Sequence, residues 1–82
     1  METTRDRVAQ YVLDYFHRRW PSATENTSLA DDLGLDAYDI YDIGRNLRGW
    51  RGTNYKPTEF EECKSVKDIV SLIFTRVQAA GN

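Results

Sequence analysis

The helical spacing of its apolar residues constrains this chain more than any other feature of the sequence. Between about residues 4 and 19, apolar side chains recur three or four positions apart, at Val8, Tyr11, Val12, Tyr15 and Phe16. This spacing places them on one face of an α-helix. Thr3 and Asp6 form a capping pair at its start, and Pro21 ends it because proline disfavours helical geometry in the residue before it. The pattern therefore predicts a long first helix.

Two later stretches repeat the pattern. A second helix is predicted from about 37 to 50, with an apolar face made by Ile40, Ile43, Leu47 and Trp50. Within it, Gly44 is expected to allow close packing or a bend. The final helix is predicted to start at Ser65, with Asp68 as its capping partner. Its apolar face consists of Val66, Ile69, Val70, Ile73 and Val77.

The connections between these helices complete the predicted fold. Residues 22–35 form a long loop, which Leu29, Leu33 and Leu35 are expected to pin to the core. A short helical turn is predicted from Pro57 or Thr58 through residues 61 and 62, with Phe60 facing inward. No strand pattern competes. The sequence predicts an all-α fold, a small four-helix bundle with a long loop between its first two helices and a short third helix.

Length, charge and cysteine content narrow the possible functions. The chain has 82 residues and a formal net charge of -2, from 11 Lys+Arg against 13 Asp+Glu. One domain covering residues 1–82 is expected, since a chain of this size supports one small core. The balanced charge argues against nucleic-acid binding. No apolar stretch is long enough to span a membrane, no secretion signal is recognisable, and the single cysteine cannot form an internal disulfide. The expected location is the cytoplasm.

The segment before the second helix carries a recognisable motif. Residues 32–39 read Asp-Leu-Gly-Leu-Asp-Ala-Tyr-Asp. This resembles the prosthetic-group attachment motif of acyl carrier proteins, Asp-Leu-Gly-x-Asp-Ser-Leu-Asp. The matching residues are Asp32, Leu33, Gly34, Asp36 and Asp39, whereas Ala37 and Tyr38 replace the usual serine and leucine. The order of predicted helices is also similar to the carrier fold over roughly residues 3 to 77, although the chain is less acidic than is usual in that family.

The resemblance implies a carrier that cannot be loaded as written. In the family, the serine hydroxyl forms a phosphodiester with 4'-phosphopantetheine, whose thiol holds the acyl chain. Ala37 has no oxygen to phosphorylate, so this cofactor is expected only if the natural residue is serine. Its place at a helix start would suit a phosphate, but Asp36 and Ala37 also make a good helix start without any ligand. Engineering and natural degeneration both explain the alanine, and the other departures from the family favour the second.

The second helix is also the candidate partner-binding surface. Carriers present an acidic second helix to basic patches on their enzymes, and Asp39 and Asp42 keep that character here, whereas Arg45 and Arg48 reverse it. One interpretation is a recognition surface of mixed charge. The other is that acids near the helix start and bases near its end complement the helix dipole, with Asp42 and Arg45 paired. Tyr38 is expected either to shield the core or, more simply, to be a partly buried anchor.

No constellation of catalytic or metal-binding residues emerges, so no catalytic residue and no metal ligand is assigned. His17 lies on the polar side of the first helix without a second ligand at suitable spacing, and it is expected to be a solvated surface residue. Cys63 has no base at motif spacing, and it is expected to be a small buried hydrophobe. The sequence therefore argues against an enzyme.

Three functions remain open at this stage. The first is an acyl or peptidyl carrier scaffold of fatty-acid, polyketide or related biosynthesis, with a phosphopantetheinyl transferase and acyl-transferring or ligase enzymes as partners. The second is a natural pseudo-carrier that acts only by binding a protein, as an adaptor or regulator. The third is an unrelated small helical interaction domain. A monomer is expected for a carrier that visits several enzymes.

Overall fold

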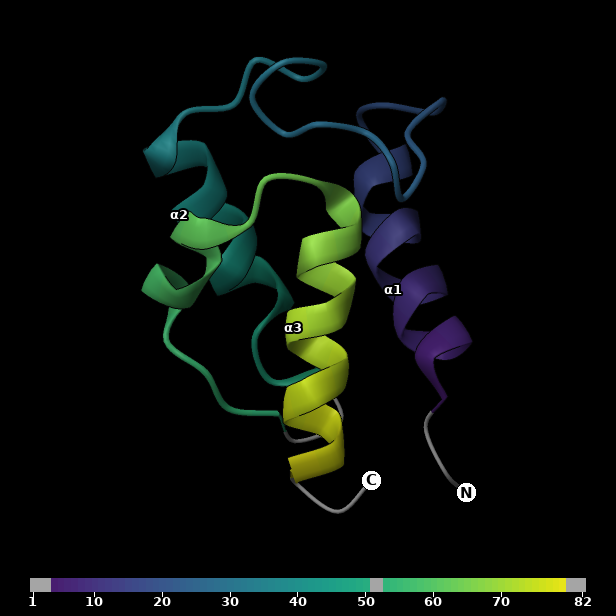
Figure 1. Ribbon diagram of the computed structural model, residues 1–82, viewed down its shortest axis with the longest axis vertical. Coiled ribbons are helices and arrows are strands. Elements are labelled where there is room, and N and C mark those ends of the chain that lie inside the picture. The colour runs from purple at the N-terminus through teal and green to yellow at the C-terminus, as the bar shows by residue number, and fades with distance from the viewer. Residues whose placement is uncertain (1–3, 51–52, 80–82) are drawn as a thin grey trace.

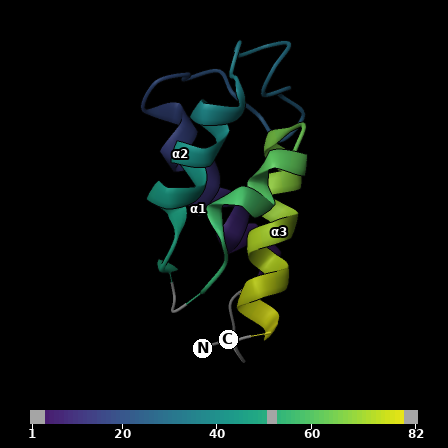
Figure 2. The ribbon, with the colours of Figure 1, turned by 90° about the vertical axis from the view of Figure 1, so that its left-hand side faces the viewer.

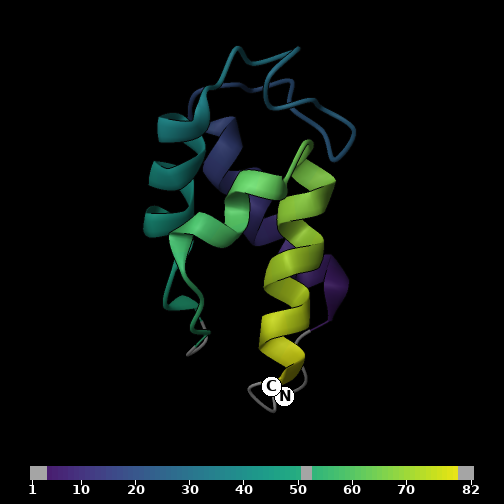
Figure 3. The same ribbon diagram turned by 60° about the vertical axis from the view of Figure 1, so that its left-hand side comes forward.

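The computed structural model describes residues 4–50 and 53–79, and it confirms the all-α fold. Its named helices within these ranges follow one another as α1 (Arg5–His17), α2 (Ala37–Leu47), the 3-10 helix η2 (Pro57–Glu62) and α3 (Val66–Ala79) (Figure 1). The described residues form no β-strand, and their β-type pairing is limited to an isolated antiparallel bridge between Ser28 and Ser65. Helices α1 and α3 pack side by side, and η2 packs against α2. Figure 3 shows η2 crossing between α2 and α3.

Two of the predicted helices are shorter than expected. Helix α1 begins at Arg5, and its cap is Thr4, whose side-chain oxygen accepts a hydrogen bond from the Arg7 backbone N–H at 3.3 Å. The predicted cap at Thr3 was wrong, and Thr3 itself lies outside the described residues. The helix ends at His17 rather than near residue 19, because the backbone N–H groups of residues 19 and 20 both turn back to the Phe16 carbonyl. A tight turn before Pro21 therefore replaces the predicted last helical residues.

Helix α2 ends at Leu47, so the predicted boundary at residue 50 was wrong. Arg48 adopts extended backbone angles, and Gly49 follows with a φ of 91°, a conformation that favours glycine. Trp50 consequently leaves the helical face. Its ring stacks on Tyr11 of α1, with the ring centroids 4.3 Å apart and the planes 7° from parallel. Trp50 still packs against the core, but from the connection after the helix.

The helices enclose one hydrophobic cluster. Its fully buried members include Val8, Val12 and Phe16 of α1, Phe60 of η2, and the five predicted apolar residues of α3. Ile40, Ile43 and Leu47 contribute from α2, whereas Tyr11 and Tyr15 lie half-buried at the edge. The apolar spacing in the sequence therefore predicted the buried faces, because each face opposes another helix.

Gly44 is explained by the close approach of η2 to α2. A Cβ atom at this position would lie 3.2 Å from backbone atoms of Pro57 and 3.3 Å from the ring of Phe60. These distances are shorter than most real Cβ contacts, so a side chain here would push the two helices slightly apart, and its absence lets them meet closely. Of the two roles expected for Gly44, close packing is confirmed.

The long loop is held by backbone hydrogen bonds to the start of α3. The Leu29 N–H donates to the Lys64 carbonyl at 2.9 Å, and the Val66 N–H donates to the Thr27 carbonyl at 3.1 Å. An ion pair of 2.6 Å between Arg5 and Glu25 ties the same loop to α1. Leu29 is fully buried and Leu35 nearly so, as predicted, while Leu33 is only half-buried. The loop is thus a packed part of the fold.

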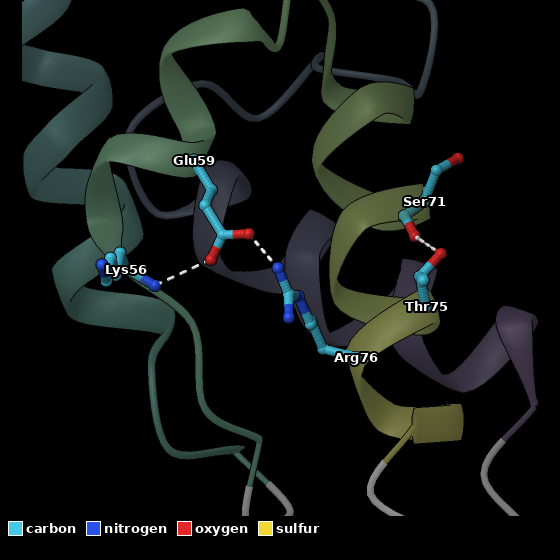
Figure 4. A network of polar contacts seen from close by, with 5 residues as sticks. All are labelled: Lys56, Glu59, Ser71, Thr75 and Arg76. Atoms are coloured by element: carbon cyan, nitrogen blue, oxygen red, sulfur yellow. Dashed lines mark hydrogen bonds and ion pairs between the residues drawn. The ribbon is translucent and has the colours of Figure 1, made fainter.

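A carboxylate fastens η2 to α3. One oxygen of Glu59 accepts a hydrogen bond from the Lys56 backbone N–H at 2.8 Å, which caps η2. The other oxygen forms an ion pair with the Arg76 guanidinium of α3 (Figure 4). At the start of α3, Asp68 accepts hydrogen bonds from the backbone N–H groups of residues 64 and 65. None of the helices that the structure describes is long and apolar enough to cross a membrane.

Candidate functional site

The turn that leads into α2 is built by residues of the sequence motif. Asp32 Oδ2 accepts a hydrogen bond from the Ser28 N–H at 2.8 Å, which closes the turn with a side chain. Gly34 has a φ of 68°, in the left-handed region, and its N–H donates to the Ala30 carbonyl at 3.0 Å. The Leu35 N–H then donates to the Leu29 carbonyl at 2.9 Å. Asp32 and Gly34 therefore have structural roles that set the entry into α2.

The two acids around position 37 form a complete capping box. Asp36 Oδ1 accepts a hydrogen bond from the Asp39 N–H at 2.9 Å, and Asp39 Oδ2 accepts one from the Asp36 N–H at 3.1 Å. The predicted cap is confirmed. Each carboxylate is engaged with backbone donors, which is a helix-starting role rather than that of an acid/base pair.

Ala37 is the first residue of α2, and its side chain is exposed. The first N–H groups of a helix lack partners within the helix and form the positive end of its dipole, so this position suits an attached phosphate. The methyl group cannot form the phosphodiester. Between residues 29 and 52 the sequence has no serine or threonine. Ser28 accepts a hydrogen bond from the Asp31 N–H, and Thr53 is buried, so neither replaces the missing hydroxyl.

Tyr38 points away from the core. Its side chain is 84% exposed, and that of Tyr41, one turn later, is 38% exposed. The expectation of a partly buried anchor was wrong, and so was that of a shield over the core. The reason is helical geometry: the buried face of α2 is made by residues 40, 43, 44 and 47, and position 38 lies on the opposite side. These two tyrosines form an exposed aromatic patch beside position 37.

The charged residues of α2 are also exposed. Asp42 and Arg45 do not form the expected ion pair within the described part of the chain. Arg45 lies in the last turn and Arg48 at the C-cap, where a positive charge complements the helix dipole. Asp39 and Asp42 instead line a hollow of about 370 Å³ between α1 and α2, and its opposite wall carries Arg18 and Arg19.

Arg18 and Arg19 are the residues of this region that the sequence analysis missed. They directly follow His17, the last residue of α1, and no role was predicted for them from the sequence. Their position near Asp39 depends on tertiary packing, which brings the end of α1 and the start of α2 to the same hollow. The available signal was the pair of arginines just before Pro21, at the end of the helix preceding the motif.

The other candidate reactive residues have structural roles. His17 is exposed, and its Nε2–H donates to the Ala23 carbonyl at 2.8 Å, which helps to close the turn after α1. Cys63 is buried, as predicted, and burial raises the pKa of its thiol to about 11, with smaller contributions from Asp68 and Glu62. Among the residues with described positions, no group of three or more His, Cys, Asp or Glu side chains could hold a metal ion.

Comparison with known proteins gives relatives of one kind. The chain is 31% identical over 68 residues to an acyl carrier protein of Lactobacillus acidophilus, covering 83% of this chain and 85% of the relative. The chain belongs to the acyl carrier protein family. An acyl carrier protein of Thermotoga maritima is 36% identical over 50 residues, 61% of this chain and 62% of the relative. An acyl carrier protein of Coprothermobacter proteolyticus is 30% identical over 50 residues, 61% of each chain. No family model matches the chain, and no solved structure matches it either.

Membership in the acyl carrier protein family makes this a carrier-type protein rather than an enzyme, as the sequence predicted. The family implies attachment of 4'-phosphopantetheine in general. Ala37, at the exposed start of α2, offers no oxygen to which that group could be attached. The turn and the helix cap around it are complete without a hydroxyl at this position.

Proposed function

We propose that this chain is a carrier-fold protein that acts without a covalently attached arm, by binding protein partners through α2. The single observation that carries the proposal is Ala37, an exposed methyl group at the start of a helix that is otherwise built like a carrier site. The capping box and the turn closed by Asp32 and Gly34 support it, because the motif acids keep these roles although residue 37 cannot be modified.

The proposed partner surface consists of the exposed charged residues Asp39, Asp42, Arg45 and Arg48. Tyr38 and Tyr41 extend it, because exposed tyrosines offer contact area at low entropic cost. The proposed partners are proteins that recognise carrier domains, such as acyl-transferring or ligase enzymes. We place the protein in the cytoplasm as a monomer, with residues 1–82 acting as one carrier-like domain.

A second candidate is a working carrier whose natural form has serine at position 37. The intact capping box favours this candidate, because a serine hydroxyl at position 37 is the one group that the start of α2 would need for attachment. Such a protein would hold acyl or peptidyl intermediates of fatty-acid, polyketide or related biosynthesis on 4'-phosphopantetheine. Both candidates require that position 37 be a carrier attachment position.

Restoring the hydroxyl tests that requirement. We expect Ala37→Ser to gain the mass of one phosphopantetheinyl group when incubated with coenzyme A and a phosphopantetheinyl transferase of broad specificity, and the unchanged chain to gain none. Ala30→Ser is the matched control, because Ala30 is also exposed and lies in the turn before α2. Intact-mass spectrometry reads the result.

An unmodified Ala37→Ser protein, under conditions that modify a standard carrier, would contradict the assignment. The double variant Ala37→Ser, Tyr38→Leu then shows whether the exposed tyrosine alone blocks the transferase. Modification of the double variant would keep position 37 as the attachment position, whereas its failure would remove the carrier site from the proposal.

A further inference from the structure

A groove follows the seam between α1 and α2. It consists of two adjoining hollows of about 370 Å³ and about 500 Å³, which share Tyr15, Arg18 and Asn46. The two helices are joined at this point, since the Asn46 side-chain amide donates a hydrogen bond to the Tyr15 hydroxyl at 2.9 Å. In the view of Figure 2, α1 lies behind α2. The lining extends from Tyr11 to Trp20 on one side and from Asp39 to Leu47 on the other, so the groove follows the two helices.

In the hollow near the start of α2 the two walls carry opposite charges, while the adjoining hollow is also lined by Asp14 of α1. Arg18 and Arg19 lie at the end of α1, and Asp39 and Asp42 lie on α2. All four residues are exposed, and within the described residues none of them forms an ion pair with another side chain. The Arg19 guanidinium lies 5.0 Å from the centroid of the Trp20 ring, and one carboxylate oxygen of Asp39 accepts the Asp36 N–H. Most of the hydrogen-bonding capacity of these charged groups is therefore available to a ligand.

The floor of the groove is apolar. Leu35 and Ile43 are 9% and 5% exposed, and both line the hollow next to the half-buried Trp20. An apolar floor between charged walls favours a side chain that can be buried while polar groups on either side pair with the walls. This combination is typical of sites that bind a short protein segment.

The charge pattern decides which segment fits. A simple anion would pair with Arg18 and Arg19 but would be repelled by Asp39 and Asp42, and a uniformly basic surface would meet the opposite problem. Like charges brought together across an interface weaken binding. Only a ligand that carries an acidic and a basic group together pairs with both walls.

We propose that the groove between α1 and α2 binds a peptide segment of a partner protein that carries neighbouring acidic and basic side chains and an apolar side chain between them. The acidic side chain pairs with Arg18 and Arg19, the basic one with Asp39 or Asp42, and the apolar one covers Leu35 and Ile43. This inference rests on the proposed function, because it names where and how a protein partner binds. The proposed binding surface therefore includes the end of α1 as well as α2, because Arg18 and Arg19 provide its positive charges and Asp39 and Asp42 its negative ones.

The test uses a phage-displayed library of random linear peptides, selected against the whole protein. We expect the selected peptides to contain both acidic and basic residues, and their binding to shift the amide resonances of residues 15, 18, 19, 42, 43 and 46. The double variant Arg18→Glu, Arg19→Glu should weaken their binding at least about tenfold. Peptides in which the acid is replaced by lysine should regain affinity for that variant.

Lys64→Glu combined with Lys67→Glu is the matched control. It makes the same change in net charge, but both lysines are exposed near the start of α3 and neither lines the groove. Its affinity for the peptides should stay within about twofold of that of the unchanged protein, as expected for charges outside an interface. If the arginine variant fails to fold, as judged by circular dichroism, Asp42→Lys tests the opposite wall with the same expected loss.

Several results would overturn the inference. Uniformly basic selected peptides would do so, as would resonance shifts confined to Tyr38, Tyr41 and the outer face of α2. In both cases the proposed function would stand, because a peptide would still bind α2. Peptide binding that is equally weakened by the two charge reversals would show long-range attraction rather than a groove contact. The absence of any selected peptide would count against the groove and against a protein-binding role together, whatever the outcome with Ala37→Ser.

Discussion

At the residue scale, burial of Cys63 between η2 and α3 decides the chemistry of its thiol. The side chain is 8% exposed, and desolvation raises its pKa from 9.0 to about 11. We therefore expect alkylation by iodoacetamide at pH 8 to be at least about 100-fold slower in the folded protein than in urea, since two pKa units reduce the thiolate fraction by that factor. Equal rates in the two states would contradict the burial of this cysteine.

The same shift predicts how stability depends on pH. Because the folded pKa is raised, the contribution of Cys63 to stability is fully present below pH 9 and is lost as the pH rises through about 11. The difference in unfolding free energy between the unchanged protein and Cys63→Ala should therefore fall over that interval. Urea unfolding at a series of pH values measures it. A difference that stays constant up to pH 11 would mean that the thiol is not shielded from water.

At the element scale, the contact between α2 and η2 depends on the missing side chain of Gly44. Gly44→Leu should lower the free energy of unfolding by about 1–3 kcal/mol, because the new side chain would overlap the Pro57 backbone and the Phe60 ring. Arg45→Leu is the matched control, since the next residue in the same helix is exposed. Urea denaturation compares the two. If Gly44→Leu were as stable as Arg45→Leu, the close approach of the two helices would be wrong.

The element scale also shows how far sequence reasoning reaches. Apolar spacing predicted each buried face, since Val8, Ile43 and Phe60 are buried as expected. Helix ends were harder to predict, because the end of α2 depends on the extended backbone of Arg48 and the positive φ of Gly49 rather than on the apolar pattern. Trp50 keeps the spacing of the helix but stacks on Tyr11 from outside it.

The candidate site was predictable in its local part and not in its tertiary part. The capping box of Asp36 and Asp39 follows from their spacing of three residues, and the structure contains it. The exposure of Tyr38 follows from the apolar face that the spacing of α2 predicts, because position 38 lies opposite that face. The position of Arg18 across the hollow from Asp42 depends on how α1 and α2 pack, which spacing within one helix does not give.

At the scale of the whole molecule, the carrier fold is complete although residue 37 has no hydroxyl. The fold does not depend on a hydroxyl at position 37, because the turn is closed by Asp32 and Gly34 and the helix is capped by Asp36. Alanine at position 37 is therefore compatible with these contacts at the start of α2. The activity that we propose for this architecture is protein binding through α2 and its seam with α1.

The intact mass of the protein isolated from its natural source tests this account most directly. We predict a mass that matches the sequence with alanine at position 37 and carries no phosphopantetheinyl group. A mass larger by one oxygen atom and one phosphopantetheinyl group would contradict the account, because it would show that the natural protein has serine at position 37 and works as a loaded carrier.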